Sequence, residues 1–216
     1  MPLEKVELGP EGVPAGTVIW LHGLGADGRD FEPIVPMLDL GVAVRFVFPH
    51  APVRPVTING GMEMRAWYDI DPRQPLAGTA DIRESADAVE DLVRDEEARG
   101  VPRSRIVLAG FSQGGVIALH LALRSESRFA GVMALSTYVH DPEHLADEIS
   151  FSSIDMPVFM AHGQMDPMIP ITRAITSREA LTGLGYDVEW HEYGMGHEVC
   201  PQEIADIATW LDANFA

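Results

Sequence analysis

Short apolar runs alternate with longer amphipathic stretches along most of the chain. Runs at residues 17–21, 42–48, 106–109, 131–136 and 157–161 have the length of buried strands, and glycine, proline or polar residues end them. We expect a short edge strand at 6–8 and a further strand at 187–193. The pattern therefore predicts about seven strands, each separated from the next by a loop or a helix.

Helices are expected between these strands. The clearest is at residues 79–99, which Gly100 ends and in which apolar residues recur on one face: Ile82, Ala86, Val89 and Val93. Further helices are expected at 31–38, 116–123, 141–149 and 171–181, and a last one from residue 201 onward. Strands that alternate with helices predict an α/β fold with a mostly parallel sheet covered on both faces, in a single domain over residues 1–216.

The junction between the strand at 106–109 and the helix at 116–123 carries the motif G-F-S-Q-G, residues 110–114. It matches the G-x-S-x-G nucleophile elbow, in which glycines allow a serine to project from a tight turn. The first backbone N–H groups of a helix have no intrahelical partner, so the N–H of Gln113 could stabilise an oxyanion beside Ser112. An ordinary glycine-rich loop is the alternative, and the flanking strand and helix favour the nucleophile.

A second glycine-rich loop, H-G-L-G-A-D-G at residues 22–28, follows the strand at 17–21. It matches neither the dinucleotide-binding fingerprint nor the Walker motif, which disfavours nucleotide binding. We expect the loop to supply a second oxyanion donor, the N–H of Leu24. His22 is expected to brace the loop through hydrogen bonds rather than to act in catalysis.

Asp166 and His197 lie in two further loops that follow strands. Together with Ser112 they give the chain order Ser, Asp, His, which is typical of α/β-hydrolases. The carboxyl ends of parallel strands meet at one edge of a sheet, so these loops are expected to converge. Ser112 would attack as the nucleophile, His197 would accept and return its proton, and Asp166 would orient the imidazole.

Residues 53–71 form the longest segment expected to lack regular structure, and Gly60 and Gly61 lie near its middle. Long loops in compact domains are usually functional. Thioethers beside an aromatic ring, here Met62 and Met64 beside Trp67, suit the wall of an apolar pocket. The same residues would equally well complete the core, and the pattern leaves both interpretations open.

Composition narrows the classes of partner. The formal net charge of −18, from 33 acidic against 15 basic residues, disfavours nucleic-acid phosphates and anionic lipid surfaces. No stretch approaches the roughly 20 apolar residues of a membrane span, and no signal-peptide pattern opens the sequence. We therefore expect a cytoplasmic protein without stable membrane insertion.

Two further nucleophile or ligand candidates are weaker. Cys200, the single cysteine, lies near His197 but has neither an elbow nor oxyanion donors, so we expect it to pack at the start of the last helix. His140 and His144 have the spacing of zinc ligands, but the other residues of a zinc motif are missing. We expect surface histidines, no metal and no cofactor.

Five blocks of the chain resemble the phospholipase/carboxylesterase family of α/β-hydrolases, which includes bacterial carboxylesterases and acyl-protein thioesterases. They include W-L-H-G-L-G-A-D-G-R-D-F, G-F-S-Q-G-G, H-G-Q-M-D-P-M-I-P and M-G-H-E-V-C-P-Q-E-I, and they follow the family order. The resemblance implies an α/β-hydrolase fold, a triad of Ser112, His197 and Asp166, and an oxyanion hole formed by the N–H groups of Leu24 and Gln113. Gln164 stands where the family often has an acidic residue, which bears on local hydrogen bonds but not on the triad.

The resemblance also implies that residues 53–71 form a lid-like loop over an acyl groove. The expected substrate-binding residues are Met62, Met64, Trp67 and Met168. A homodimer is expected only because relatives often form one.

We therefore predict a serine carboxylesterase that hydrolyses small esters with short to medium acyl chains through an acyl-serine intermediate. The block G-G-M-E-M-R-A-W-Y-D at residues 60–69 resembles the bacterial esterases more than the thioesterases, which favours soluble esters. An acyl-protein thioesterase or a lysophospholipase would use the same triad. A hydrolase-fold protein that binds a small ligand without turnover is the alternative outside the enzymes.

Overall fold

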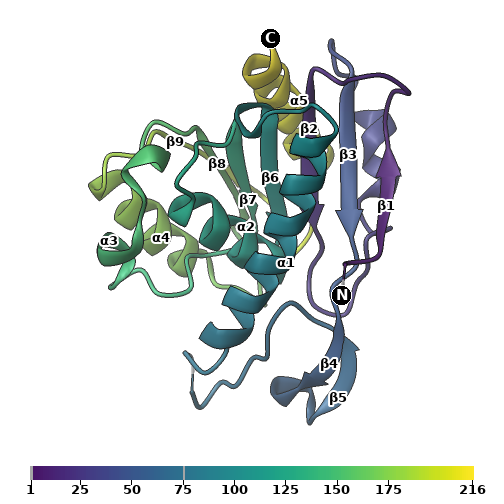
Figure 1. The fold of residues 1–216 in the computed structure, drawn as a ribbon. Helices are drawn as coiled ribbons and strands as arrows, with labels where there is room; N and C mark the ends of the chain where they lie inside the picture. The colour runs from purple at the N-terminus through teal and green to yellow at the C-terminus, as the bar shows by residue number, and fades with distance from the viewer. Residues whose placement is uncertain (1, 75) are drawn as a thin grey trace.

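The computed structural model describes residues 2–74 and 76–216, and a central sheet organises them (Figure 1). Seven strands lie in the order β1-β3-β2-β6-β7-β8-β9. Their bounds are β1 Lys5–Leu8, β2 Gly16–Leu21, β3 Val44–Pro49, β6 Ile106–Phe111, β7 Gly131–Leu135, β8 Val158–Gly163 and β9 Val188–Tyr193. Each neighbouring pair is parallel except that of β1 and β3, in which the edge strand β1 is antiparallel. The expected α/β fold with a mostly parallel sheet is confirmed.

Helices cover both faces of this sheet. Their bounds are α1 Thr79–Ala98, α2 Gln113–Arg124, α3 Leu145–Glu148, α4 Ile171–Gly183 and α5 Pro201–Phe215. Strand β2 shows the two faces: Ile19 and Leu21 belong to the core cluster with α1, α2 and α4, whereas Val18 and Trp20 belong to the cluster with α5. All residues of β2 are buried, which explains why its sequence is a continuous apolar run.

Two expected helices are shorter or tighter than the pattern predicts. Residues 31–38 form a 3-10 helix, Glu32–Met37, in which Pro33 and Pro36 remove backbone hydrogen-bond donors. The helix expected at 141–149 is a single turn, α3, preceded by bends where the side chain of His144 bonds that of Asp141. Local side-chain bonds of this kind compete with helix formation.

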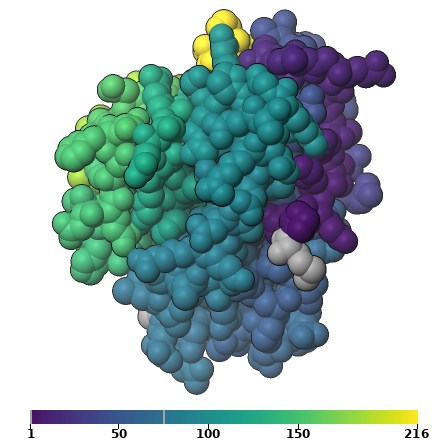
Figure 2. All heavy atoms as spheres, viewed as in Figure 1, coloured from purple at the N-terminus to yellow at the C-terminus, as the bar shows by residue number. Residues whose placement is uncertain are grey.

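The segment at residues 53–71 contains a β-hairpin, where we expected no regular structure. Strand β4, Val53–Val56, pairs antiparallel with β5, Met62–Arg65, and the 3-10 helix Thr57–Asn59 lies in the turn between them. Gly60 and Gly61 complete the turn with φ angles of 69° and 80°, a conformation that favours glycine. The hairpin lies apart from the central sheet, at the lower end of the molecule in Figures 1 and 2, where residues near 50–80 gather.

Candidate active site

Ser112 lies on the sharp turn between β6 and α2. Its φ angle is 53°, which is rare for a residue other than glycine. The turn is held because the Ser112 N–H donates to the carbonyl of Leu135 (2.9 Å) and its carbonyl accepts from the Thr137 hydroxyl (2.6 Å). A Cβ on Gly110 would collide with the first turn of α2, and one on Gly114 would lie 2.5 Å from a β2 carbonyl oxygen. The steric role expected of these glycines is confirmed.

Asp166 and His197 form a direct hydrogen bond. The Nδ1–H of His197 donates to Oδ2 of Asp166 over 2.7 Å, and Oδ1 accepts from the N–H groups of Met168 (2.8 Å) and Ile169 (2.9 Å). Burial by itself raises the pKa of Asp166, but the hydrogen bonds from His197 and the two backbone N–H groups outweigh it and lower that pKa below its ordinary value. The carboxylate is therefore ionised near neutral pH and orients the imidazole.

Backbone contacts hold the loops of Asp166 and His197 together. The N–H of Met165 donates to the carbonyl of Met195 over 3.0 Å, and the N–H of Gln164 donates to that of Tyr193 over 2.8 Å. A Cβ on Gly163 would collide with the carbonyl of the residue before His197, so the two chains touch at this point. The Gln164 side chain donates to the carboxylate of Glu192 over 3.2 Å.

His162 packs under the loop that carries Asp166, called here the acid loop, and bonds its backbone. Its side chain is fully buried, and Nε2 lies 2.8 Å from the Ile169 carbonyl and 3.4 Å from Oδ2 of Asp166. Burial lowers the pKa of His162. A neutral imidazole that donates to a backbone carbonyl leaves the charge of Asp166 directed at His197.

Ser112 is linked to His197 through its neighbour Phe111 and not through a hydrogen bond of its own among the described residues. The ring of Phe111, the preceding residue, packs against the His197 ring with centroids 4.7 Å apart. Across the described residues, the Ser112 hydroxyl makes no hydrogen bond to His197. Catalytic hydrogen bonds of this type are often long in unliganded enzymes and tighten around substrate. The structure thus joins the acid and the base and places the serine on the adjacent turn.

The two residues expected to donate backbone N–H groups to an oxyanion, Leu24 and Gln113, belong to segments that approach Ser112. Gln113 is the first residue of α2, and Leu24 follows Gly23, where a Cβ would lie 3.5 Å from the Cβ of Ser112. Within residues 2–74 and 76–216, neither the Leu24 N–H nor the Gln113 N–H has a backbone acceptor. An oxyanion hole requires backbone donors of this kind that have no other acceptor.

His22 braces the loop that carries Leu24, as expected. Its Nε2 accepts from the Ala51 N–H (3.0 Å), which places the ring proton on Nδ1, where it donates to the Gly23 carbonyl (2.7 Å). Burial lowers the pKa of His22 to about 4, so the ring is neutral near pH 7.

Trp67 lies elsewhere than expected. We expected it to line the acyl groove, but its side chain has no exposed surface. Its indole N–H donates inward to the His22 carbonyl over 2.9 Å, and its backbone N–H donates to Oε1 of Gln113 over 2.7 Å. The prediction of a groove-lining role is therefore wrong in this structure, and the core interpretation of Trp67 is correct.

The three methionines expected at the groove lie nearer the surface. Met62 is 62% exposed on the hairpin, and Met168, two residues after Asp166, is 72% exposed. Met64 is half-buried, and its sulfur lies 3.8 Å from the position of a Cβ on Gly25, next to Leu24. These side chains therefore provide apolar surface on both the hairpin and the acid loop.

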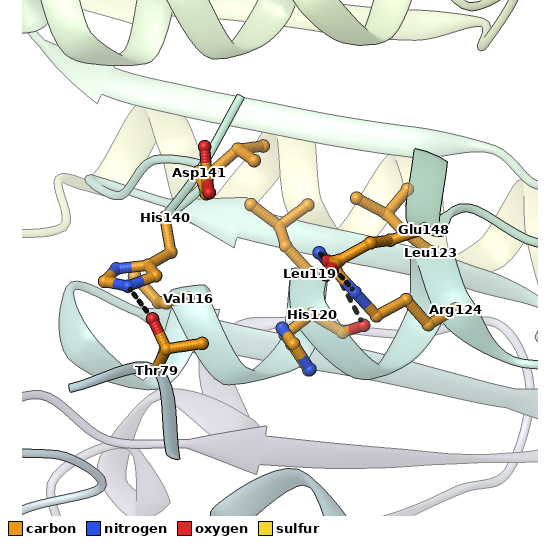
Figure 3. A pocket seen from close by; sticks show the side chains of 10 residues that line it. Thr79, Val116, Leu119, His120, Leu123, Arg124, His140, Asp141 and Glu148 are labelled. Atoms are coloured by element: carbon orange, nitrogen blue, oxygen red, sulfur yellow. Dashed lines mark hydrogen bonds and ion pairs between the residues drawn. The ribbon is translucent and has the colours of Figure 1, made fainter. Parts of the chain in front are cut away.

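The weaker nucleophile and metal candidates lie outside this arrangement. Cys200 precedes α5 and packs, partly buried, against the core cluster of that helix. Figure 3 shows a small cavity, about 30 Å³, where the half-buried His140 points toward the Thr79 hydroxyl (3.1 Å). His144 is exposed and bonds Asp141. Among the described side chains, no three His, Cys, Asp or Glu are grouped to hold a metal ion.

Comparison with known proteins places this geometry in context. A family model described as phospholipase/carboxylesterase matches residues 5–215. Acyl-protein thioesterase 1 of Cryptococcus neoformans is 35% identical over 229 residues, covering 97% of this chain and 96% of the relative. The crystal structure of Zea mays acyl-protein thioesterase 2 superposes with a TM-score of 0.86 at 25% identity, covering 99% of each chain. Esterase PE8 gives a TM-score of 0.84 at 27% identity and the same coverage.

The described helices differ from membrane-spanning helices. In the part of the chain that the structure describes, none is long and apolar enough to cross a bilayer. The longest helix, α1, has charged residues along its exposed face and an apolar face that packs against α2 and the sheet. Its apolar residues are therefore already used in the core.

Proposed function

Because the chain belongs to the phospholipase/carboxylesterase family, we propose that this serine hydrolase of the esterase or thioesterase type is a carboxylesterase with Ser112 as its nucleophile. The observation that carries the proposal is the 2.7 Å hydrogen bond between His197 and Asp166 beside a serine elbow. A protein that only binds its ligand is disfavoured, because the family is described as phospholipase/carboxylesterase and its relatives are named as a thioesterase and an esterase.

The proposed reaction proceeds through two acyl transfers. The Oγ of Ser112 attacks the ester carbonyl carbon while Nε2 of His197 takes the hydroxyl proton, and Asp166 stabilises the imidazolium that forms. The N–H groups of Leu24 and Gln113 donate to the oxyanion. Collapse of the tetrahedral intermediate expels the alcohol, which takes the proton from His197. Water, activated by the same imidazole, then releases the acid and regenerates the serine.

Two variants test the assignment of the nucleophile. Ser112→Ala is expected to lower kcat on the order of 10⁶-fold, because no other group in the site would form the acyl intermediate. Cys200→Ala is the control and should leave kcat within about threefold, because its thiol packs against the α5 core. Turnover of Ser112→Ala at a rate comparable to the unmodified protein would refute the proposal.

Short to medium acyl esters are the proposed substrates. Two features support this choice: the block G-G-M-E-M-R-A-W-Y-D, which resembles bacterial esterases, and the similarity to esterase PE8. Exposed Met62 and Met168 offer apolar contacts to an acyl chain. Each added CH₂ that is buried is worth about 0.8 kcal/mol, or about fourfold in kcat/KM, until the groove ends.

A thioester on an acylated protein is the second candidate. It is favoured by the relatives at about 35% identity, which are named acyl-protein thioesterases. The candidates are separated by measuring kcat/KM for esters from butyryl to palmitoyl and for the matched thioesters. A lysophospholipid is assayed in the same series to test lysophospholipase activity. We expect kcat/KM for esters to peak below palmitoyl. A steady rise to palmitoyl together with preference for the thioesters would favour the second candidate.

We further propose that the protein works in the cytoplasm. Cys200 is the single cysteine, so it has no partner for an internal disulfide, and a free thiol is typical of a reducing compartment. Cell fractionation should recover the chain with cytoplasmic markers. Recovery with exported or membrane markers would contradict the proposed compartment.

A further inference from the structure

We infer that Trp67 and the side chain of Gln113 are positioning residues that fix the spacing between the two oxyanion N–H groups. The inference rests on the proposed function, in which the N–H groups of Leu24 and Gln113 bind the oxyanion. These donors come from segments nearly ninety residues apart in the sequence. Their separation in space therefore depends on contacts between those segments.

The first contact joins the Gln113 side chain to the backbone of Trp67 and Tyr68, and it holds the donor on the elbow. The Gln113 side chain is 2% exposed, and both of its polar atoms are paired. Its Oε1 accepts from the Trp67 N–H over 2.7 Å, and its Nε2–H donates to the Tyr68 carbonyl over 2.7 Å. A buried amide with two such bonds is expensive to displace, because moving it leaves polar groups unpaired. The first turn of α2 is therefore tied to the chain that follows β5.

The second contact joins the Trp67 indole to His22, and it holds the loop that carries Leu24. The indole N–H of Trp67 donates to the His22 carbonyl over 2.9 Å, and the two rings lie 5.3 Å apart. The Trp67 carbonyl accepts from the Ser85 hydroxyl of α1, so the residue is also held from outside the site. His22 in turn bonds the carbonyl of Gly23, the residue before Leu24. Trp67 thus connects the elbow donor to the loop donor through hydrogen bonds.

The hairpin is part of the same unit. The carbonyl of Arg65 at the end of β5 accepts from the Gly25 N–H over 2.9 Å, and its guanidinium donates to the Ala51 carbonyl over 2.9 Å. The loop that carries Leu24 is therefore attached to the hairpin on one side and to Trp67 on the other. Oxyanion donors act only within a few tenths of an ångström of their working positions, so a loosened loop should slow the chemistry more than substrate binding.

A matched pair of tryptophans makes the inference testable. Trp20 is fully buried like Trp67, lies on β2 two residues before His22, and stacks on Phe31 with ring centroids 5.0 Å apart. In the described structure its indole N–H has no hydrogen-bond partner. Trp20→Phe and Trp67→Phe therefore remove the same atoms, but only the second breaks a hydrogen bond to the oxyanion loop.

The first readout separates kcat from KM. Trp67→Phe is expected to lower kcat by about 10- to 100-fold and to change KM by less than about threefold, because the shift affects the transition state. Trp20→Phe should leave both within about threefold. Thermal unfolding of the two variants shows that each is folded at the assay temperature.

The second readout reports on the oxyanion itself. In a thionoester, negative charge develops on sulfur, a weaker acceptor with a longer bond to carbon, so correctly placed N–H donors favour the matched oxoester. Trp67→Phe, and independently Gln113→Glu, which removes the donor to Tyr68, should lower the oxoester-to-thionoester ratio of kcat/KM by about fivefold or more. Trp20→Phe should leave the ratio unchanged.

Three outcomes are distinguishable. A ratio that falls in Trp67→Phe and Gln113→Glu but not in Trp20→Phe supports the inference. Equal losses on both substrate types, or a loss in Trp20→Phe as large as in Trp67→Phe, overturn it and indicate a packing role, while Ser112-dependent turnover leaves the proposed function standing. An unmodified protein without Ser112-dependent turnover would overturn the proposed function and this inference together.

Discussion

The two halves of the candidate active site are built from different kinds of interaction. On the side of β8 and β9, Asp166 is ionised and bonds His197, so this half works through charge. On the side of β2 and the hairpin, His22, Trp67 and Gln113 are neutral and are joined by hydrogen bonds to the backbone.

The difference follows from what each half must do. A proton acceptor must change its charge during the reaction, whereas an oxyanion hole needs fixed dipoles that remain the same. Substitutions in the charged half should therefore abolish proton transfer, while those in the neutral half should misplace donors and weaken stabilisation by a smaller amount.

Among the variants that distinguish the two halves, Asp166→Asn is expected to cause the largest loss of kcat. An amide at this position can donate to Nδ1 of His197 and so hold the tautomer that no longer accepts the serine proton. By analogy with other triads, kcat should fall by about 10⁴-fold. Steady-state kinetics with a soluble ester measures this loss.

A second Asp–His pair provides the control. Asp141 bonds the exposed His144 over 3.0 Å, outside the candidate site, so Asp141→Asn removes a similar bond without touching Asp166 or His197. Its kcat should stay within about threefold. Comparable losses in both variants would contradict the assignment of Asp166.

The protein is expected to lose stability at alkaline pH because of a buried carboxyl group, that of Glu203. Glu203 in the first turn of α5 is fully buried, and neither carboxyl oxygen has a partner among the described residues. Burial raises the pKa of this carboxyl to about 8. Because the unfolded chain releases this proton near its ordinary pKa, the free energy of unfolding falls as pH rises from about 4.5, and the loss due to Glu203 is complete above about 8.

Glu203→Gln should remove that dependence. We expect the variant to gain about 3 to 5 kcal/mol in free energy of unfolding at pH 9 relative to the unmodified protein, and much less at pH 5. Denaturant unfolding at the two pH values measures the gain. Glu179→Gln, at an exposed site on α4, is the control and should show no pH-dependent gain. An equal effect of Glu203→Gln at both pH values would contradict the buried-acid account.

The protein is also expected to lose stability at acid pH because of His22, which belongs to the neutral half. The folded pKa of His22 is about 4, below its ordinary value of 6.5, so its contribution to stability is complete above about 6.5 and is lost as pH falls toward 4. His22→Gln cannot titrate. It should therefore lose less stability than the unmodified protein between pH 7 and 4.5, by about 2 kcal/mol.

His120 contributes to the same loss of stability at acid pH, because burial lowers its pKa to about 4 as well. A His120→Gln background isolates the contribution of His22 in the same unfolding series. If His22→Gln on that background loses stability at the same rate as its parent between pH 7 and 4.5, the neutral, buried state assigned to His22 is wrong.

The predictability of the site also differs between the halves. Apolar runs predict the strands, and the chain order of Ser112, Asp166 and His197 predicts that their loops lie at one edge of the sheet. These features depend on local pattern and on the geometry of parallel sheets. The structure brings Asp166 and His197 into contact, as that reasoning requires.

The neutral half was harder to predict because its contacts join distant residues. Trp67 beside methionines fits a pocket wall as well as a core, and its complete burial and its indole bond to His22 decide between them. The Gln113 side-chain contacts span about forty-five residues, and no local pattern indicates them. The pattern does not predict the hairpin of β4 and β5, because Pro55 is atypical of a strand, although Gly60 and Gly61 are typical of a turn.

Covalent labelling tests the central claim, that Ser112 is activated by His197 and Asp166, most directly. A fluorophosphonate reacts with an activated serine, and intact-mass measurement followed by peptide mapping locates the adduct. The account predicts one adduct per chain on Ser112, loss of labelling in Ser112→Ala, strongly slowed labelling in Asp166→Asn, and normal labelling in Cys200→Ala. Failure of the folded, unmodified protein to react, or an adduct on any residue other than Ser112, would contradict it.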